Sequence, residues 1–151
     1  MQNKFIFFML LVVSTFVPFT ATAKSMGNGL NNYEQLMVGK VWETTEALDQ
    51  NKMQIDAKDT KVANFFGLAE YYADGTFKIT TFEGKPKLHG DWSFSDDGKT
   101  RSLTAKNDKG DVLFVRVVEN VTVTSDEYTY RIYPEKDNKK VFFDIVHKVK
   151  K

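Results

Sequence analysis

The sequence contains no cysteine, only two histidines and three prolines, and almost no excess of charge of either sign. The absence of cysteine excludes disulfides, thiolate metal ligands, a cysteine nucleophile and a lipidated N-terminal cysteine. A formal net charge of +1 gives no electrostatic reason to expect a nucleic-acid partner. The 151 residues fit a single domain, and a 42% hydrophobic content is too high for a disordered chain.

Residues 1–23 have the features of a secretory signal peptide. Lys4 is the only charged residue in this segment, and residues 5–13 form an unbroken apolar run. This run is shorter than the roughly 20 residues that span a bilayer. The segment ends in Ala-Thr-Ala, which matches a signal-peptidase site. We expect cleavage after Ala23 and a secreted or periplasmic protein without a membrane span; the alternative is an uncleaved anchor. Secretion without cysteine suggests a bacterial source.

The chain that follows the signal peptide begins with a polar segment. Residues 24–32 are rich in glycine and asparagine, which predicts a flexible leader. Asn32 is then placed to cap a short helical turn over residues 33–38, which Gly39 would end. The domain itself is expected to span residues 33–151.

The rest of the sequence consists of short strand-like segments separated by turn signals. Asp74 with Gly75, and Asp97 with Gly98, are dipeptides that favour tight turns. Such short connections predict antiparallel neighbours in sequence order. Eight strands are expected, over residues 40–47, 65–73, 76–83, 87–95, 99–106, 111–122, 126–133 and 140–149.

Eight consecutive antiparallel strands need protection for their two outer edges. No helical stretch is long enough to cover an open sheet, whereas closure into a barrel removes both edges. The sequence therefore predicts an all-β fold, an eight-stranded antiparallel up-and-down barrel with a short N-terminal helical turn. A two-sheet sandwich is the alternative. Two segments, 65–73 and 111–122, are apolar on both faces, so each is either covered on two sides or contacts a partner.

One connection is unusually long. Residues 48–64 are mostly polar, and loops of this length commonly act as lids or mobile segments. Its apolar members are expected to fold over a barrel mouth: Met53, Ile55, Val62 and Ala63.

This layout resembles the calycin type of barrel, which includes lipocalins and their bacterial lipocalin-like relatives. The likeness rests on the helical turn, the long first loop and Gly39-Lys40-Val41-Trp42, which is similar to the lipocalin Gly-x-Trp motif with one extra residue. Residues 41–45, 72–77 and 90–94 resemble an uncharacterised family of secreted bacterial domains. The lipocalin likeness implies a ligand cavity, and a basic side chain, Arg131 or Lys148, packed over Trp42.

Five residues are candidates for binding a ligand inside such a barrel: Trp92, Arg116, Tyr128, Tyr130 and His147. Strand parity places them on inward faces, so Arg116 could meet a carboxylate and His147 could make a polar contact. Two alternatives remain open. His147 is otherwise a partly exposed histidine at a strand end, and the strand arginines Arg101, Arg116 and Arg131 otherwise pack at the surface or the barrel floor.

The sequence contains no catalytic motif. Neither histidine has a second ligand at metal spacing, and no serine lies in a nucleophile elbow, so we expect no metal and no cofactor. An enzyme using His147 with Asp144 or a tyrosine is the weakest hypothesis. The first hypothesis is a monomeric, secreted barrel that binds a small apolar or amphipathic ligand. The second is an extracellular or cell-envelope protein-interaction or inhibitor-like module with a filled interior, acting through segments 65–73 and 111–122.

Overall fold

The computed structural model describes residues 29–151, so the predicted signal peptide and most of the predicted leader lie outside the described residues. Strands make up about half of the described chain, which also has one short α-helix and one 3₁₀ turn. In chain order the elements are α1 (Asn32–Met37), β1 (Val41–Asp49), β2 (Gln54–Ile55), η1 (Ala63–Phe65), β3 (Leu68–Tyr71), β4 (Thr76–Thr80), β5 (Pro86–Phe94), β6 (Thr100–Lys106), β7 (Val112–Val123), β8 (Glu127–Ile132) and β9 (Phe143–Val149).

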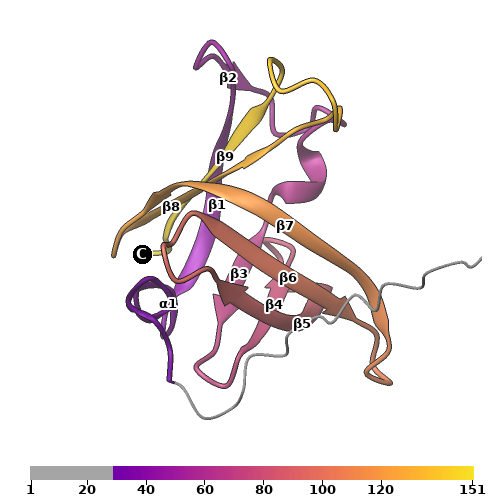
Figure 1. The fold of residues 1–151 in the computed structure, drawn as a ribbon. Helices are drawn as coiled ribbons and strands as arrows, with labels where there is room; N and C mark the ends of the chain where they lie inside the picture. The colour runs from indigo at the N-terminus through magenta and orange to yellow at the C-terminus, as the bar shows by residue number, and fades with distance from the viewer. Residues whose placement is uncertain (1–28) are drawn as a thin grey trace, which may run out of the picture.

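The strands close into an antiparallel barrel (Figure 1). From β3 to β9 each strand pairs with the next along the chain, and β1 pairs with both β3 and β9. The eight strands of the barrel are therefore β1 and β3–β9, which confirms the predicted fold and excludes the sandwich. The short β2 is an extra strand on the second half of β1.

The interior is built by side chains at every second position, as an alternating pattern requires. In β6, for example, Arg101, Leu103 and Ala105 are buried, while the residues between them are partly exposed. Aromatic rings fill much of this interior, and the buried ones include Phe77, Trp92, Phe94, Tyr128, Tyr130 and Phe143. Phe114 is 37% exposed and lines an opening in the side of the barrel.

The helical turn closes one end of the barrel, but its cap is Asn31 and not Asn32. The Asn31 side chain accepts a hydrogen bond from Glu34 N, and the Glu34 carboxylate accepts one from Asn31 N at 2.9 Å, a capping box. The other Glu34 oxygen accepts a hydrogen bond from Phe94 N at 3.0 Å, which ties α1 to β5. Asn31 and Asn32 thus belong to the folded domain.

The contact predicted over the first tryptophan is made by a different residue. Lys40 Nζ lies 5.5 Å from the centroid of the buried Trp42 ring. Arg131 instead forms an ion pair with Asp144, and Lys148 is exposed. The prediction of Arg131 or Lys148 was therefore wrong, because the chain supplies a cation only two residues from the tryptophan.

Candidate functional site

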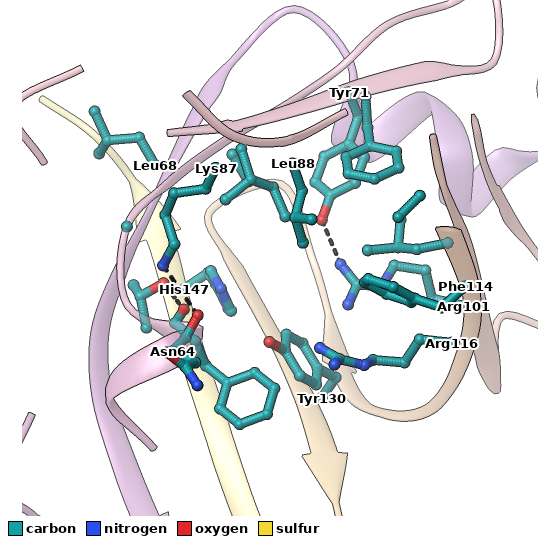
Figure 2. A pocket seen from close by; sticks show the side chains of 18 residues that line it. Asn64, Leu68, Tyr71, Lys87, Leu88, Arg101, Phe114, Arg116, Tyr130 and His147 are labelled. Carbon is teal, nitrogen blue, oxygen red and sulfur yellow. Dashed lines mark hydrogen bonds between the residues drawn. The ribbon is translucent and has the colours of Figure 1, made fainter. Parts of the chain in front are cut away.

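A narrow hollow enters the side of the barrel between η1 and the first half of β7 (Figure 2). Its enclosed part has a volume of about 40 Å³, and the whole hollow, including the part open to solvent, holds about 570 Å³. Exposed Asn64, Phe114 and Arg116 lie at the mouth, and buried Arg101 and His147 lie inside. The enclosed part has room for a water molecule or a small head group.

The long 48–64 segment contributes to this mouth only at its end. Asn64 and the adjoining Phe65 line the hollow. Val62 is fully buried, as expected for a segment folded onto the barrel. Ile55 instead pairs with Ala47 in the β1–β2 hairpin, and Met53 is 64% exposed. The expectation that Met53 covers the mouth was wrong, because the chain turns back onto β1 before it reaches the opening.

The deepest charged group of the hollow is Arg101, which is 3% exposed. Its guanidinium carbon lies 4.5 Å from the centroid of the Tyr130 ring and 5.2 Å from that of Tyr128. One terminal nitrogen donates a hydrogen bond to the Tyr71 hydroxyl. None of the ion pairs within residues 29–151 includes Arg101, and its Nε has no hydrogen-bond partner there. A buried positive charge therefore lacks a carboxylate to balance it.

Two further polar atoms beside Arg101 are also unsatisfied within residues 29–151: the Tyr128 hydroxyl and His147 Nδ1. The His147 ring stacks on Tyr130, with 5.3 Å between the ring centroids, and lies 5.3 Å from the Tyr128 centroid. Burial, with the positive charge of Arg101, lowers the pKa of His147 to about 3, so the imidazole is neutral at neutral pH. A neutral imidazole carries one N–H, and Nδ1 can hold it.

Two more cations lie at the entrance. The Arg116 guanidinium carbon is 5.3 Å from the ring centroids of both Phe65 and Phe114. Lys87 Nζ donates hydrogen bonds to the carbonyl oxygens of Asn64 at 3.0 Å and Phe66 at 2.8 Å, which hold the η1 region against β5. No aspartate or glutamate is among the lining residues within the described chain. The charged side chains that line the hollow are thus all cationic, and the other lining residues are neutral.

The structure brings four of the five predicted ligand-binding residues together. Arg116, Tyr130 and His147 line the hollow, and Tyr128 lies directly behind them without lining it. Trp92 is buried away from the hollow, where its ring packs on Tyr71 and its Nε1 donates to the Tyr72 carbonyl oxygen at 3.0 Å.

Two interpretations of the sequence were wrong at this site. His147 is only 5% exposed, so it is not a strand-end surface histidine. Arg101 is in the interior and not at the surface or floor. Its parity with Leu103 and Ala105 in β6 was the signal that would have placed it there.

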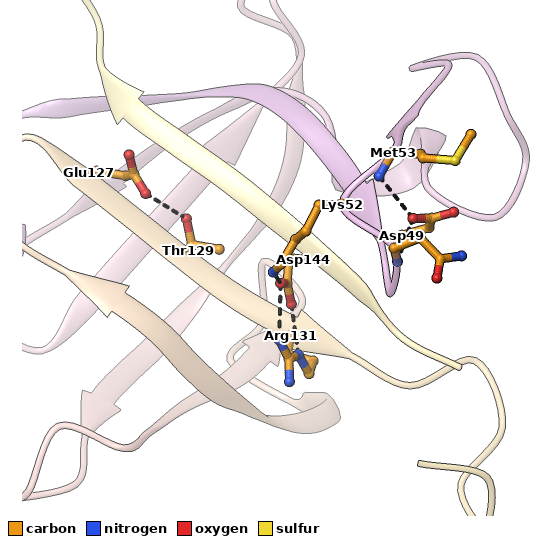
Figure 3. Close-up of polar contacts among 8 residues, drawn as sticks. Asp49, Lys52, Met53, Glu127, Thr129, Arg131 and Asp144 are labelled. Atoms are coloured by element: carbon orange, nitrogen blue, oxygen red, sulfur yellow. Dashed lines mark hydrogen bonds and ion pairs between the residues drawn. The ribbon is translucent and has the colours of Figure 1, made fainter. Parts of the chain in front are cut away.

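Asp144 does not assist His147. It lies on the opposite face of β9, where the Arg131 Nε and a terminal nitrogen donate to its two oxygens at 2.7 and 3.0 Å (Figure 3). Lys52 Nζ adds a contact at 2.6 Å. Burial alone would raise the pKa of the Asp144 carboxyl, but the bonds from Arg131 and Lys52 outweigh burial and lower it below its usual range. The Asp144 carboxylate therefore stabilises the contact with Arg131 and Lys52 and does not contact His147.

Removing the Arg131 guanidinium is expected to destabilise the barrel by about 2–4 kcal/mol, because Arg131→Ala leaves a buried carboxylate with one exposed partner. Lys52 is the matched control. Its side chain is 60% exposed, so Lys52→Ala should cost about 0–1 kcal/mol. Urea denaturation at pH 7 measures both values.

The same pair should show a defined pH dependence. Because the folded-state pKa of Asp144 is depressed, its contribution is present above the ordinary carboxyl pKa and is lost as pH falls through the lower folded value. The difference between wild type and Arg131→Ala should therefore shrink in acid. A difference that stays constant down to acid pH, or an equal loss in Lys52→Ala, would contradict this assignment.

Within the described part of the chain, no group of three or more histidine, aspartate or glutamate side chains is arranged to hold a metal ion. No helix between residues 29 and 151 is long and apolar enough to cross a membrane.

Comparison with known sequences places the chain in a family. Curated proteins give no match. Residues 34–151, which include the whole barrel and most of α1, match a family described as a domain of unknown function, DUF4822. This match covers well over half of the chain, and it agrees with the resemblance to an uncharacterised family that the sequence motifs indicate. The protein therefore belongs to the DUF4822 family.

Proposed function

We propose that this barrel binds a small amphipathic molecule with an acidic head group. The observation that carries the proposal is Arg101, a buried guanidinium that has no carboxylate partner and an unsatisfied Nε among residues 29–151. A carboxylate entering the hollow would supply the missing negative charge. It could also accept a hydrogen bond from His147 Nδ1, another unsatisfied group, whose side chain lines the hollow.

The dimensions of the hollow set the size of such a ligand. An enclosed volume of about 40 Å³ admits a head group but not a whole amphipathic molecule. The apolar part of the ligand must therefore lie in the open part of the hollow, along Leu68, Ile79, Leu88 and Phe114. Arg116 at the mouth would attract the anion before it enters.

This arrangement favours acidic ligands over neutral ones with the same tail. A hydrogen bond to a charged group contributes about 1.5–3 kcal/mol, whereas the tail contributes equally in both cases. The location outside the cytoplasm that the N-terminal segment predicts would expose the protein to such molecules in its surroundings, and we propose it as the site of action.

Isothermal titration with octanoate, octan-1-ol and octylammonium tests the proposal. The three probes share one tail and differ in the charge of the head group. We expect octanoate to bind at least about tenfold more tightly than octan-1-ol, and octylammonium to bind most weakly. Equal affinity for octanoate and octan-1-ol, or no binding of octanoate at all, would refute the proposal.

A further inference from the structure

The first half of β7 has a free edge. Residues 112–118 pair with β6 on one side, but the pairing of β7 with β8 begins only at Glu119. In Figure 1, β7 continues beside β6 past the region where β8 and β9 lie. No other strand within residues 29–151 pairs with this edge. An unpaired, apolar strand edge is a template for pairing with another chain.

The side chains at this edge are unusually apolar for a surface. Leu113, Val115 and Val117 are 57%, 59% and 63% exposed on the outer face. Phe114 and Arg116 lie on the inner face, at the mouth of the hollow.

The direction of the backbone groups follows from one hydrogen bond. Asn120 N donates to Lys99 O, on the β6 side. Because N–H and C=O groups alternate between the two edges of an antiparallel strand, Val118, Arg116 and Phe114 also face β6. The N–H and C=O groups of Val115 and Val117 therefore point away from β6. The alternation does not extend to Leu113, because the pairing of β7 with β6 is irregular there.

We propose that two copies of this chain pair antiparallel along residues 112–118, with the twofold axis at Val115. In this register Val115 of each copy lies opposite Val115 of the other, and Leu113 lies opposite Val117. Val115 then exchanges both backbone hydrogen bonds with Val115 of the other copy, and the backbone groups of Val117 also face the other strand. The pairing departs from the monomer that the sequence suggested, and it does not depend on the proposed ligand.

Other positions of the twofold axis would also give a symmetric pair of strands, but the side chains favour the axis at Val115. With the axis at Val115, Arg116 of one copy lies opposite Phe114 of the other, a favourable cation–aromatic contact. With the axis at Arg116, the two guanidinium groups would lie opposite each other. With the axis at Phe114, Val117 would lie opposite Asp111, whose carbonyl oxygen already accepts from Asn107 N.

A second copy of the chain is the partner that fits the free edge, because the edge of residues 112–118 is self-complementary. Each outward residue meets an apolar outward residue, and the single charge at positions 112–118 meets a ring. The pairing would also place the mouths of the two hollows, each lined by Phe114 and Arg116, next to each other.

Charge substitutions at the axis test the proposal. Sedimentation velocity should show a species of twice the mass of one chain as the wild-type concentration rises from about 1 to 500 µM. Val115→Lys and Val115→Glu each place like charges opposite each other and should weaken association at least about tenfold. An equimolar mixture of the two variants should restore it, because the charges then attract.

Val121→Lys is the matched control, since Val121 is also an exposed valine of β7 but lies outside the free edge. It should associate as the wild type does. Amide hydrogen exchange of wild-type Val115 and Val117 should slow as concentration rises, which gives a readout that needs no variant. If the wild type stayed monomeric at every concentration, the proposal would be overturned. The free edge would then be available only to an extended segment of another protein. Variants that associate normally, or a mixture that fails to restore association, would also overturn the proposal.

Discussion

Replacing Gly90 with alanine is expected to destabilise the barrel by about 3 kcal/mol or more, because β6 lies so close to this glycine of β5 that there is no room for a side chain. Gly90 has a φ of +152°, and an added Cβ would lie 1.9 Å from the carbonyl oxygen of Thr104. Since that neighbour is backbone, it can yield only if the β5–β6 pairing opens.

The effect of the close contact can be separated from that of the backbone conformation. Gly84 also has a positive φ, +85°, but no atom lies within 4 Å of a Cβ added there. Gly84→Ala should therefore cost only about 1–2 kcal/mol, the penalty of an L-residue in this conformation. Urea denaturation of both variants gives the comparison. If Gly90→Ala lost no more stability than Gly84→Ala, the close contact between Gly90 and the backbone of β6 would be contradicted.

Replacing Arg101 with methionine is expected to weaken octanoate binding roughly 30- to 150-fold, because a charged hydrogen-bond donor contributes about 2–3 kcal/mol. The unliganded barrel should be at least as stable as the wild type. Methionine has a similar length without a charge that needs a buried partner, and Arg101 has no carboxylate partner to lose within the described part of the chain. Titration calorimetry measures the affinity and urea denaturation measures the stability.

Arg116→Met is the control for this prediction. Arg116 lies at the exposed mouth, where solvent screens its charge, so its loss should weaken binding by only about three- to tenfold. If Arg116→Met lost as much affinity as Arg101→Met, the charge at the mouth and not the buried one would be the recognition element. If Arg101→Met bound octanoate as the wild type does, the interior site would be refuted.

The architecture could be predicted from the sequence because the signals that define it are local. Turn dipeptides such as Asp97 and Gly98 mark the ends of strands, and alternation within each strand separates its inner face from its outer face. Closure followed from the need to protect the edges of eight antiparallel strands. The apolar residues on both faces of 111–122 indicated a strand that is covered on two sides or contacts a partner, although only the register showed that the edge of residues 112–118 is unpaired.

The candidate site was harder to predict because it depends on contacts between distant strands. Tyr130 and His147 were expected inside from parity alone. The role of Arg101 depends on tyrosines from β3 and β8 and on the absence of a carboxylate beside it, and no local pattern carries that information. Met53 was misplaced for a related reason, since the sequence of a long loop does not reveal where it turns back.

The most direct test of ligand binding at Arg101 is a crystal structure of the protein soaked or grown with octanoate. The octanoate carboxylate should lie within hydrogen-bonding distance, roughly 3 Å, of Arg101 Nε, with the tail leading out past Phe114. A hollow that contains only water at a saturating concentration of octanoate, or a ligand bound elsewhere on the barrel, would contradict ligand binding at Arg101.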